Sequence, residues 1–198
     1  MSDVLFLCTG NLCRSVMAQG LLAARLAERG VLVPVGSAGL LAGGRRPPAE
    51  VISVMAARGI DVAGHASRAV TADDLAAAGL IIGLAREHVR HAAVLRPDAW
   101  PRAFTIRELL RRGGQAGPRG PAESLADWLA RAADGRVRAD VLGRSPDDDV
   151  ADPVGGPLPR YQATAALLDR LTRDLVELGW PERRTLPESA GPVRDKGF

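Results

Sequence analysis

Short apolar runs alternate with longer amphipathic segments through the first half of the chain. An apolar run within residues 3–8 predicts a strand that is buried on both faces. Further strands are predicted at 31–35, 80–82 and 103–106. Helices are predicted over 14–29, 47–59 and 86–95, with a short one after Thr71 and a long one from Pro157 to Leu178.

This alternation predicts an α/β fold with a parallel sheet. Each crossover between parallel strands is right-handed, so successive helices cover both faces of the sheet. Four strands therefore predict a three-layer domain built on a four-stranded parallel sheet. A chain of 198 residues is long enough to bury one such core and too short to require two.

Composition narrows the possible classes of function. Lysine and arginine number 26 against 23 acidic residues, and the two signs are interspersed along the chain. We therefore expect no nucleic-acid partner. No apolar stretch is long enough to span a bilayer, and the first residues lack the pattern of a signal peptide. We accordingly expect neither a membrane association nor secretion.

Cysteine and histidine usage narrows the cofactor chemistry. The two cysteines, Cys8 and Cys13, lie in one loop and cannot form a structural disulfide framework, so a reducing cytoplasm is expected. The three histidines, at positions 65, 88 and 91, lack the spacing of a familiar metal site. We expect no metal and no other cofactor. The oligomeric state is not indicated by any of these features.

Residues 8–15 read Cys-Thr-Gly-Asn-Leu-Cys-Arg-Ser and connect the first predicted strand to the first predicted helix. Five residues between Cys8 and Arg14 can wrap so that their backbone N–H groups converge on an anion at the helix N-terminus. The same field favours the thiolate of Cys8, which is the nucleophilic form. Arg14 can donate two hydrogen bonds to the oxygens of the bound anion.

Three further residues of this loop have predicted roles. Gly10 permits a positive φ and close approach of the backbone to the anion. Asn11 tolerates the left-handed region and can bond its neighbours to hold the loop open. Ser15 is placed to cap the following helix and to donate a hydrogen bond to the Cys8 thiolate, and the sequence does not separate these two roles.

The string Val-Leu-Phe-Leu-Cys-Thr-Gly-Asn-Leu-Cys-Arg-Ser resembles the phosphate-binding loop of the low-molecular-weight protein tyrosine phosphatases. Asp152-Pro153 matches the Asp-Pro pair that carries the general acid in that family. The resemblance covers residues 3–112 and 149–179. It implies the strand order 2-1-3-4 and a metal-independent phosphomonoester hydrolase that forms a thiophosphate on Cys8, with Asp152 as general acid and then general base.

The resemblance also implies the residues around the phosphate. The phosphate-binding residues would be Thr9, Gly10, Asn11, Leu12, Cys13, Arg14 and Ser15. Ser37 and His65 match positions that brace the loop asparagine. Asp147, Asp148 and Asp149 precede the proposed acid, and Asp149 is the alternative to Asp152.

The substrate remains open between a phosphoprotein and a small phosphate ester. Tyrosine-directed members usually have an aromatic residue after the Asp-Pro pair, whereas this chain has Val154-Gly155-Gly156. That form resembles bacterial branches that include protein arginine phosphatases. Those enzymes carry threonine at the loop position of Leu12, where an apolar residue is the tyrosine-type choice. Protein arginine phosphatase and small-metabolite phosphatase are therefore the alternative activities.

Two other classes fit less well. Arsenate reductases share the loop but use further cysteines downstream, and none follows Cys13. A non-catalytic anion-binding module would need neither Cys8 nor Asp152. Cys13 itself has two interpretations, a resolving thiol that forms a disulfide with oxidised Cys8 or a small residue packed under the loop.

We expect a single phosphatase domain over 1–180, with an insertion at about 111–148 and a loosely ordered tail at 181–198 that is rich in proline and charge. Residues 113–118 are expected to be flexible, and 121–133 to include an amphipathic helix. The insertion is either a surface excursion or a flap that shapes the substrate mouth, since its end lies close to Asp152.

Overall fold

The computed structural model of the protein describes residues 3–182. The tail predicted at 181–198 lies outside these residues except for Pro181 and Glu182. The described chain folds around a parallel sheet of four strands, which are β1 (Val4–Cys8), β2 (Val35–Gly39), β3 (Leu80–Gly83) and β4 (Ala103–Thr105). Their order is β2-β1-β3-β4, as predicted.

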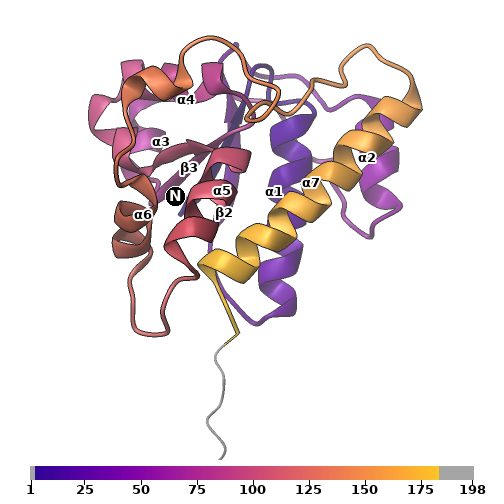
Figure 1. Cartoon of the computed structure of the whole chain (residues 1–198). Helices are drawn as coiled ribbons and strands as arrows, with labels where there is room; N and C mark the ends of the chain where they lie inside the picture. The colour runs from indigo at the N-terminus through magenta and orange to yellow at the C-terminus, as the bar shows by residue number, and fades with distance from the viewer. Residues whose placement is uncertain (1–2, 183–198) are drawn as a thin grey trace, which may run out of the picture.

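Helices cover both faces of this sheet (Figure 1). The helices are α1 (Arg14–Glu28), α2 (Ala49–Ala56), α3 (Ala72–Ala77), α4 (Arg86–Leu95), α5 (Ile106–Ala116), α6 (Leu125–Ala133) and α7 (Leu158–Gly179), with 3-10 turns η1 (Pro97–Arg102) and η2 (Arg138–Val141). One face packs on α1, α2, α5, α6 and α7, and the other on α3, α4 and η1. The predicted three-layer architecture is confirmed.

Strand β1 lies between β2 and β3, and every residue in it is buried. Phe6 and Cys8 face the larger helical layer, while Leu5 and Leu7 face the layer of α3 and α4. Successive side chains of a strand point to opposite faces, so a strand covered on both sides must be apolar throughout. The unbroken apolar run was therefore a reliable signal.

The second strand was predicted at 31–35, and this prediction is wrong. Strand β2 runs over Val35–Gly39, in register from Val4 opposite Val35 to Cys8 opposite Gly39. The valine-rich stretch before it is a connector in which Leu32 is 96% exposed. Small residues form the strand instead, because its end passes directly behind the loop that follows β1.

The prediction of a flexible stretch at 113–118 is also wrong over most of its length, because helix α5 continues to Ala116. Thr105 and Glu108 form a capping box that starts this helix. Gly113 allows close packing, since a Cβ there would lie 2.8 Å from Cζ2 of Trp128. The close approach of α6 thus stabilises the end of the helix, where Gly113 and Gly114 favour it weakly.

The 111–148 segment is part of the core rather than a surface excursion. The side chain of Trp128 on α6 is fully buried, and its Nε1 donates to the carbonyl of Gly117 at 2.9 Å. Arg136 forms a buried ion pair with Glu108, and its guanidinium carbon lies 3.6 Å and 4.3 Å from the ring centroids of Trp100 and Phe104. These contacts join the segment to α5 and η1.

Replacement of Trp128 by alanine tests this integration. We expect Trp128→Ala to lower the free energy of unfolding by about 3–5 kcal/mol, because a fully buried indole is lost together with its hydrogen bond. Urea titration followed by circular dichroism measures the change. Ala130→Ser, at an exposed position of the same helix, should change stability by less than about 0.5 kcal/mol. Equal stability of the two variants would mean that the segment folds as an excursion.

Candidate active site

The proposed phosphate-binding loop connects the carboxyl end of β1 to the start of α1. Strand β1 lies between β2 and β3, so the chain leaves it in one direction and later returns on the other side. Ligands of open α/β sheets bind at such a switch point, outside the carboxyl ends of the strands. Cys8 is the last residue of β1 and Arg14 is the first of α1.

The sulfur of Cys8 is buried and receives two polar contacts from its own loop. The backbone N–H of Asn11 donates to Sγ at 3.2 Å, and Oγ of Ser15 lies 3.0 Å from Sγ. Because Asn11 Nδ2 donates to the Ser15 oxygen, the Ser15 hydroxyl hydrogen is free to be donated to the sulfur. Both contacts stabilise negative charge on Cys8.

Of the two roles that the sequence leaves open for Ser15, the structure shows the contact with Cys8 and not the helix cap. Helix α1 begins at Arg14, so Ser15 lies within its first turn, and no side chain caps the helix at Cys13. The Ser15 hydroxyl is directed to the sulfur instead. Only one of its two predicted contacts is present.

Asn11 holds the shape of the loop. Its φ is 50°, in the left-handed region expected for it. Its Nδ2 donates to Ser37 Oγ at 2.8 Å, and its Oδ1 accepts from the N–H of Arg68 at 3.0 Å. Nε2 of His65 lies 3.0 Å from the Asn11 carbonyl oxygen. Ser37 and His65 therefore both contact the loop asparagine, and Ser37 in turn donates to Gln19.

Gly10 does not use the positive φ that a glycine permits, because the left-handed position of this loop, among the described residues, is that of Asn11. The glycine that the loop does require is Gly39, which the sequence analysis did not assign to the site. A Cβ at Gly39 would lie 2.9 Å from the Asn11 nitrogen and 3.0 Å from the Gly10 carbonyl carbon. The cluster of small residues at the end of β2 was the available signal.

The guanidinium of Arg14 is buried and binds the segment that carries Asp152. Its Nη2 lies 2.6 Å from Asp152 Oδ2, and its Nη1 donates to the Val150 carbonyl at 3.1 Å. Nη2 also lies within 3.3 Å of Thr9 Oγ1. Within residues 3–182, Nε of Arg14 is buried without a hydrogen-bond partner. That N–H is a donor available to an anion in the loop.

Asp152 rather than Asp149 reaches this centre. The Asp152 side chain is 39% exposed, and its Oδ1 accepts from the Val154 N–H at 3.2 Å. The carboxylate of Asp149 is occupied elsewhere, since it accepts from the backbone N–H of Arg86 at 2.8 Å and of Ser145 at 3.2 Å. Geometry therefore favours Asp152 over the alternative acid.

Two residues of α4 support Thr9 and were not assigned to the site from the sequence. The Thr9 hydroxyl donates to Glu87 Oε1 at 3.2 Å, and His88 Nε2 lies 3.2 Å from Thr9 Oγ1. Burial and the nearby Arg14 cation lower the pKa of His88 to about 3. His88 is therefore neutral at physiological pH and orients Thr9 without adding charge to the site.

A cavity of about 160 Å³ lies above the sulfur, and residues of the loop, Arg14 and Asp152 all line it. Its lining residues are Cys8, Thr9, Gly10, Leu12, Cys13, Arg14, Leu41, Arg45, Asp152 and Val154. Leu12, Leu41 and Val154 provide aliphatic walls, and no aromatic side chain lines this cavity. The cavity can accept an oxyanion at its base and an aliphatic or thin aromatic group above it.

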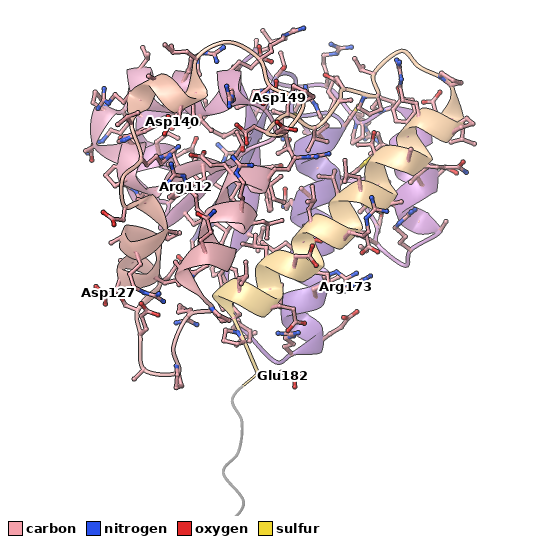
Figure 2. All side chains as sticks on the ribbon, viewed as in Figure 1. Arg112, Asp127, Asp140, Asp149, Arg173 and Glu182 are labelled. Atoms are coloured by element: carbon pink, nitrogen blue, oxygen red, sulfur yellow. The ribbon has the colours of Figure 1, made fainter. Side chains whose placement is uncertain are left out.

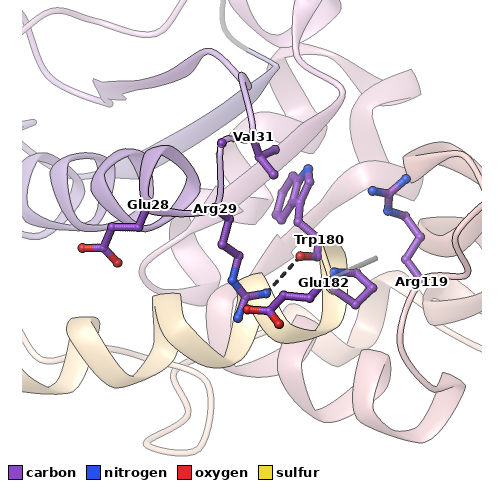
Figure 3. Close-up of a pocket in the computed structure, with 8 residues that line it drawn as sticks. Glu28, Arg29, Val31, Arg119, Trp180 and Glu182 are labelled. Carbon is purple, nitrogen blue, oxygen red and sulfur yellow. Dashed lines mark hydrogen bonds between the residues drawn. The ribbon is translucent and has the colours of Figure 1, made fainter. Parts of the chain in front are cut away.

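A cavity of about 440 Å³ shares Thr9, Arg14 and Asp152 with the first one. A further cavity, of about 690 Å³, lacks this chemistry and is lined by the far end of α1 and by Trp180 (Figure 3). There Arg29 donates to the Trp180 carbonyl at 3.0 Å, and Arg119 donates to the carbonyls of Gly179 and Glu123. It contains neither a cysteine nor a histidine.

Cys13 lines the 160 Å³ cavity as a free thiol, as Cys8 does. Burial, with further contributions from Asp152 and Cys8, raises the pKa of Cys13 to about 12. A thiol with this pKa is a weak nucleophile at neutral pH, which favours the packing role over the resolving role. Disulfide formation between the two cysteines stays a prediction.

Comparisons with known proteins identify the family. The profile of the family described as low molecular weight phosphotyrosine protein phosphatase matches residues 3–116, more than half of the chain. The chain therefore belongs to this family.

Individual relatives differ in how much of the chain they cover. The low molecular weight protein-tyrosine-phosphatase Etp of Escherichia coli (strain K12) is 34% identical over 49% of this chain, and the match spans 64% of Etp. The protein-arginine-phosphatase of Bacillus subtilis (strain 168) is 26% identical over 92% of this chain and 99% of its own length. The low molecular weight protein tyrosine phosphatase of T. tengcongensis superposes with a TM-score of 0.68, at 30% identity, over 89% of this chain and 99% of that one.

Two further observations concern the described residues only. No group of three or more histidine, cysteine or acidic side chains within 3–182 is arranged to hold a metal ion. None of the helices in that range is long and apolar enough to cross a bilayer.

The close packing at Gly39 generates a prediction. Gly39→Ala should displace Asn11 and raise the inhibition constant of inorganic phosphate by about tenfold, because the added methyl overlaps the loop backbone. Competition kinetics with an aryl phosphate measures it. Gly114→Ala places a methyl in open space on α5 and is the matched control. Unchanged phosphate inhibition in a folded Gly39→Ala protein would contradict the bracing role.

Proposed function

We propose that the protein is a cysteine-dependent phosphomonoester hydrolase of the low-molecular-weight protein tyrosine phosphatase type. The observation that carries the proposal is the convergence of Cys8, Arg14 and Asp152 on one small cavity that the loop backbone closes. The three groups come from positions up to 144 residues apart in sequence, so chance proximity is a poor explanation. Family membership supports the same chemistry.

In the first half-reaction the Cys8 thiolate attacks phosphorus and the bond from phosphorus to the leaving oxygen breaks. Backbone N–H groups of the loop and the Arg14 guanidinium hold the remaining phosphoryl oxygens. Asp152 transfers its proton to the leaving oxygen. The products are the leaving alcohol, or amine in a phosphoramidate, and a thiophosphate on Cys8.

In the second half-reaction water attacks the thiophosphate and Asp152 takes its proton. The bond from sulfur to phosphorus breaks, and inorganic phosphate leaves with Cys8 restored as a thiolate. The Ser15 hydroxyl and the Asn11 N–H stabilise the departing sulfur, since both already point at it. Arg14 and the loop supply the positive charge for both steps, so we assign no cofactor.

We propose a phosphorylated protein as the substrate class, with phosphotyrosine and phosphoarginine as the two candidates. Leu12 is the apolar loop residue of the tyrosine-type pattern. The aliphatic walls at Leu41 and Val154, together with the full-length match to a protein-arginine-phosphatase, favour phosphoarginine. A small phosphorylated metabolite is the alternative to a protein substrate.

Two free thiols without a disulfide support a reducing compartment, which we propose is the cytoplasm.

The roles of the nucleophile and the acid generate the main prediction. Asp152→Ala should lower kcat/KM for phenyl phosphate by about a hundredfold to ten-thousandfold, because kcat/KM reports the first half-reaction, in which this leaving group requires a proton. It should lower kcat/KM for 4-nitrophenyl phosphate much less. Steady-state kinetics on both esters measures the contrast.

Cys8→Ser is the companion variant. It should abolish turnover of both esters and retain binding of inorganic phosphate, since the loop N–H groups and Arg14 remain. Isothermal titration calorimetry measures the binding. An equal fall in kcat/KM for both esters in Asp152→Ala would contradict the role of Asp152 as general acid. Turnover by Cys8→Ser would contradict the role of Cys8 as nucleophile.

Substrate preference is tested at position 154, where the side chain is 53% exposed. Val154→Tyr should raise kcat/KM for a phosphotyrosine peptide by about threefold to tenfold, because it adds a ring that can stack on the substrate. The kcat/KM for a phosphoarginine peptide should not rise. Leu158→Tyr, outside the cavity lining, is the control. An identical change for both peptides would contradict a role for position 154 in selecting the leaving group.

A further inference from the structure

The residues just before Asp152 are held by an unusual concentration of charge. Asp148 lies at the end of the 111–148 segment and its side chain is 4% exposed. Arg86 at the start of α4 lies 2.7 Å from one of its oxygens, and Arg111 of α5 lies 2.8 Å from the other. An aspartate that buried is stable as a charge only with such partners.

The ion pair of Arg111 and Asp148 also closes the base of the segment. These two residues lie at its two ends, 37 positions apart in sequence. The chain between them packs against α5 through Trp128 and Arg136, so the end of the segment has a fixed position. Hydrogen bonds from Arg111 and Arg86 lower the pKa of Asp148 despite its burial, which keeps the carboxylate charged at neutral pH.

The next two residues are bound as tightly. Ala85, the residue before α4, provides no side-chain cap, and the carboxylate of Asp149 accepts the free N–H of Arg86 in its place (Figure 2 labels Asp149). The Val150 N–H donates to the Leu84 carbonyl at 2.8 Å. Three successive residues are thus anchored to the start of α4, and Asp152 follows only two positions later.

We propose that Asp148, Arg86 and Arg111 form a clamp that positions Asp152 for proton transfer, an inference that rests on the proposed function. Two residues span at most about 7 Å, so the place of the Asp152 carboxyl is set by where Val150 is held. None of the three clamp residues lines the 160 Å³ cavity, and they act only through Asp152. They are positioning residues.

The clamp predicts a defect that depends on the leaving group. Arg111→Gln and Asp148→Asn should each lower kcat/KM for phenyl phosphate by about tenfold to a hundredfold, since displacement of a catalytic group by about 1 Å has effects of this size. They should change kcat/KM for 4-nitrophenyl phosphate less than about twofold. The inhibition constant of inorganic phosphate should not change.

A double-variant cycle separates positioning from general damage. In the Asp152→Ala background, Asp148→Asn and Arg111→Gln should have no further effect on phenyl phosphate, because the group they position is absent. Arg111→Lys keeps the charge and should restore part of the rate. Arg111 is half-exposed, so Arg111→Gln keeps the test valid if Asp148→Asn does not fold.

Arg173→Gln is the matched control. Arg173 lies on α7, is about as exposed as Arg111, and pairs with Asp169 at 3.4 Å, outside the 111–148 segment (Figure 2). Its ratio of kcat/KM for the two esters should equal that of the wild type.

Three results would overturn the clamp. These are an equal fall in kcat/KM for both esters in the clamp variants, a fall of the same size when Asp152 is already alanine, and wild-type kcat/KM for phenyl phosphate in folded Arg111→Gln. Absence of activity on both esters in the wild-type protein would instead overturn the proposed function itself, together with the inference that rests on it.

Discussion

A buried arginine at the start of a helix is the constraint on which the site depends. Arg14 places a cation next to the positive end of the α1 dipole, where an anion is favoured instead. Burial of the guanidinium increases the cost of leaving it unpaired. In the described structure Asp152 supplies the opposite charge. The segment that carries Asp152 is thereby held over the loop by the same cation that would bind a phosphate.

Under the proposed mechanism, this arrangement links substrate binding to the state of Asp152. A phosphate dianion in the loop would compete with Asp152 for Arg14, whose buried Nε has no hydrogen-bond partner within residues 3–182. The Asp152 carboxyl would then be free to face the leaving oxygen, within the range that the anchored residues before it allow.

Much of the fold was predictable because local pattern and tertiary environment agree. The apolar run of β1, the capping residue Thr71 and the bounds of α4 all follow from burial or from capping chemistry. The strand at 31–35 failed because apolar composition was weighed above the space that the loop requires behind Gly39. The helix through Gly113 was missed because its stability comes from contact with Trp128, which local propensity does not contain.

The residues of the candidate site also divide into those that the sequence pattern predicts and those that it does not. The loop residues are contiguous, so their spacing alone indicates an anion cradle. The partners of Asn11 lie 26 and 54 residues away, and only resemblance to a family pointed to Ser37 and His65. Glu87 and His88 contact Thr9 across the switch point of the sheet, and no local motif indicates such a contact.

We propose that Cys8 carries the phosphoryl group during turnover. Rapid acid quench of the protein with excess aryl phosphate, followed by peptide mass spectrometry, tests this role directly. We expect a peptide that contains Cys8 and has gained one phosphoryl group, and no such gain in Cys8→Ala. Steady turnover with no phosphorylated Cys8 peptide, or with the phosphoryl group on another residue, would show that Cys8 is not the nucleophile.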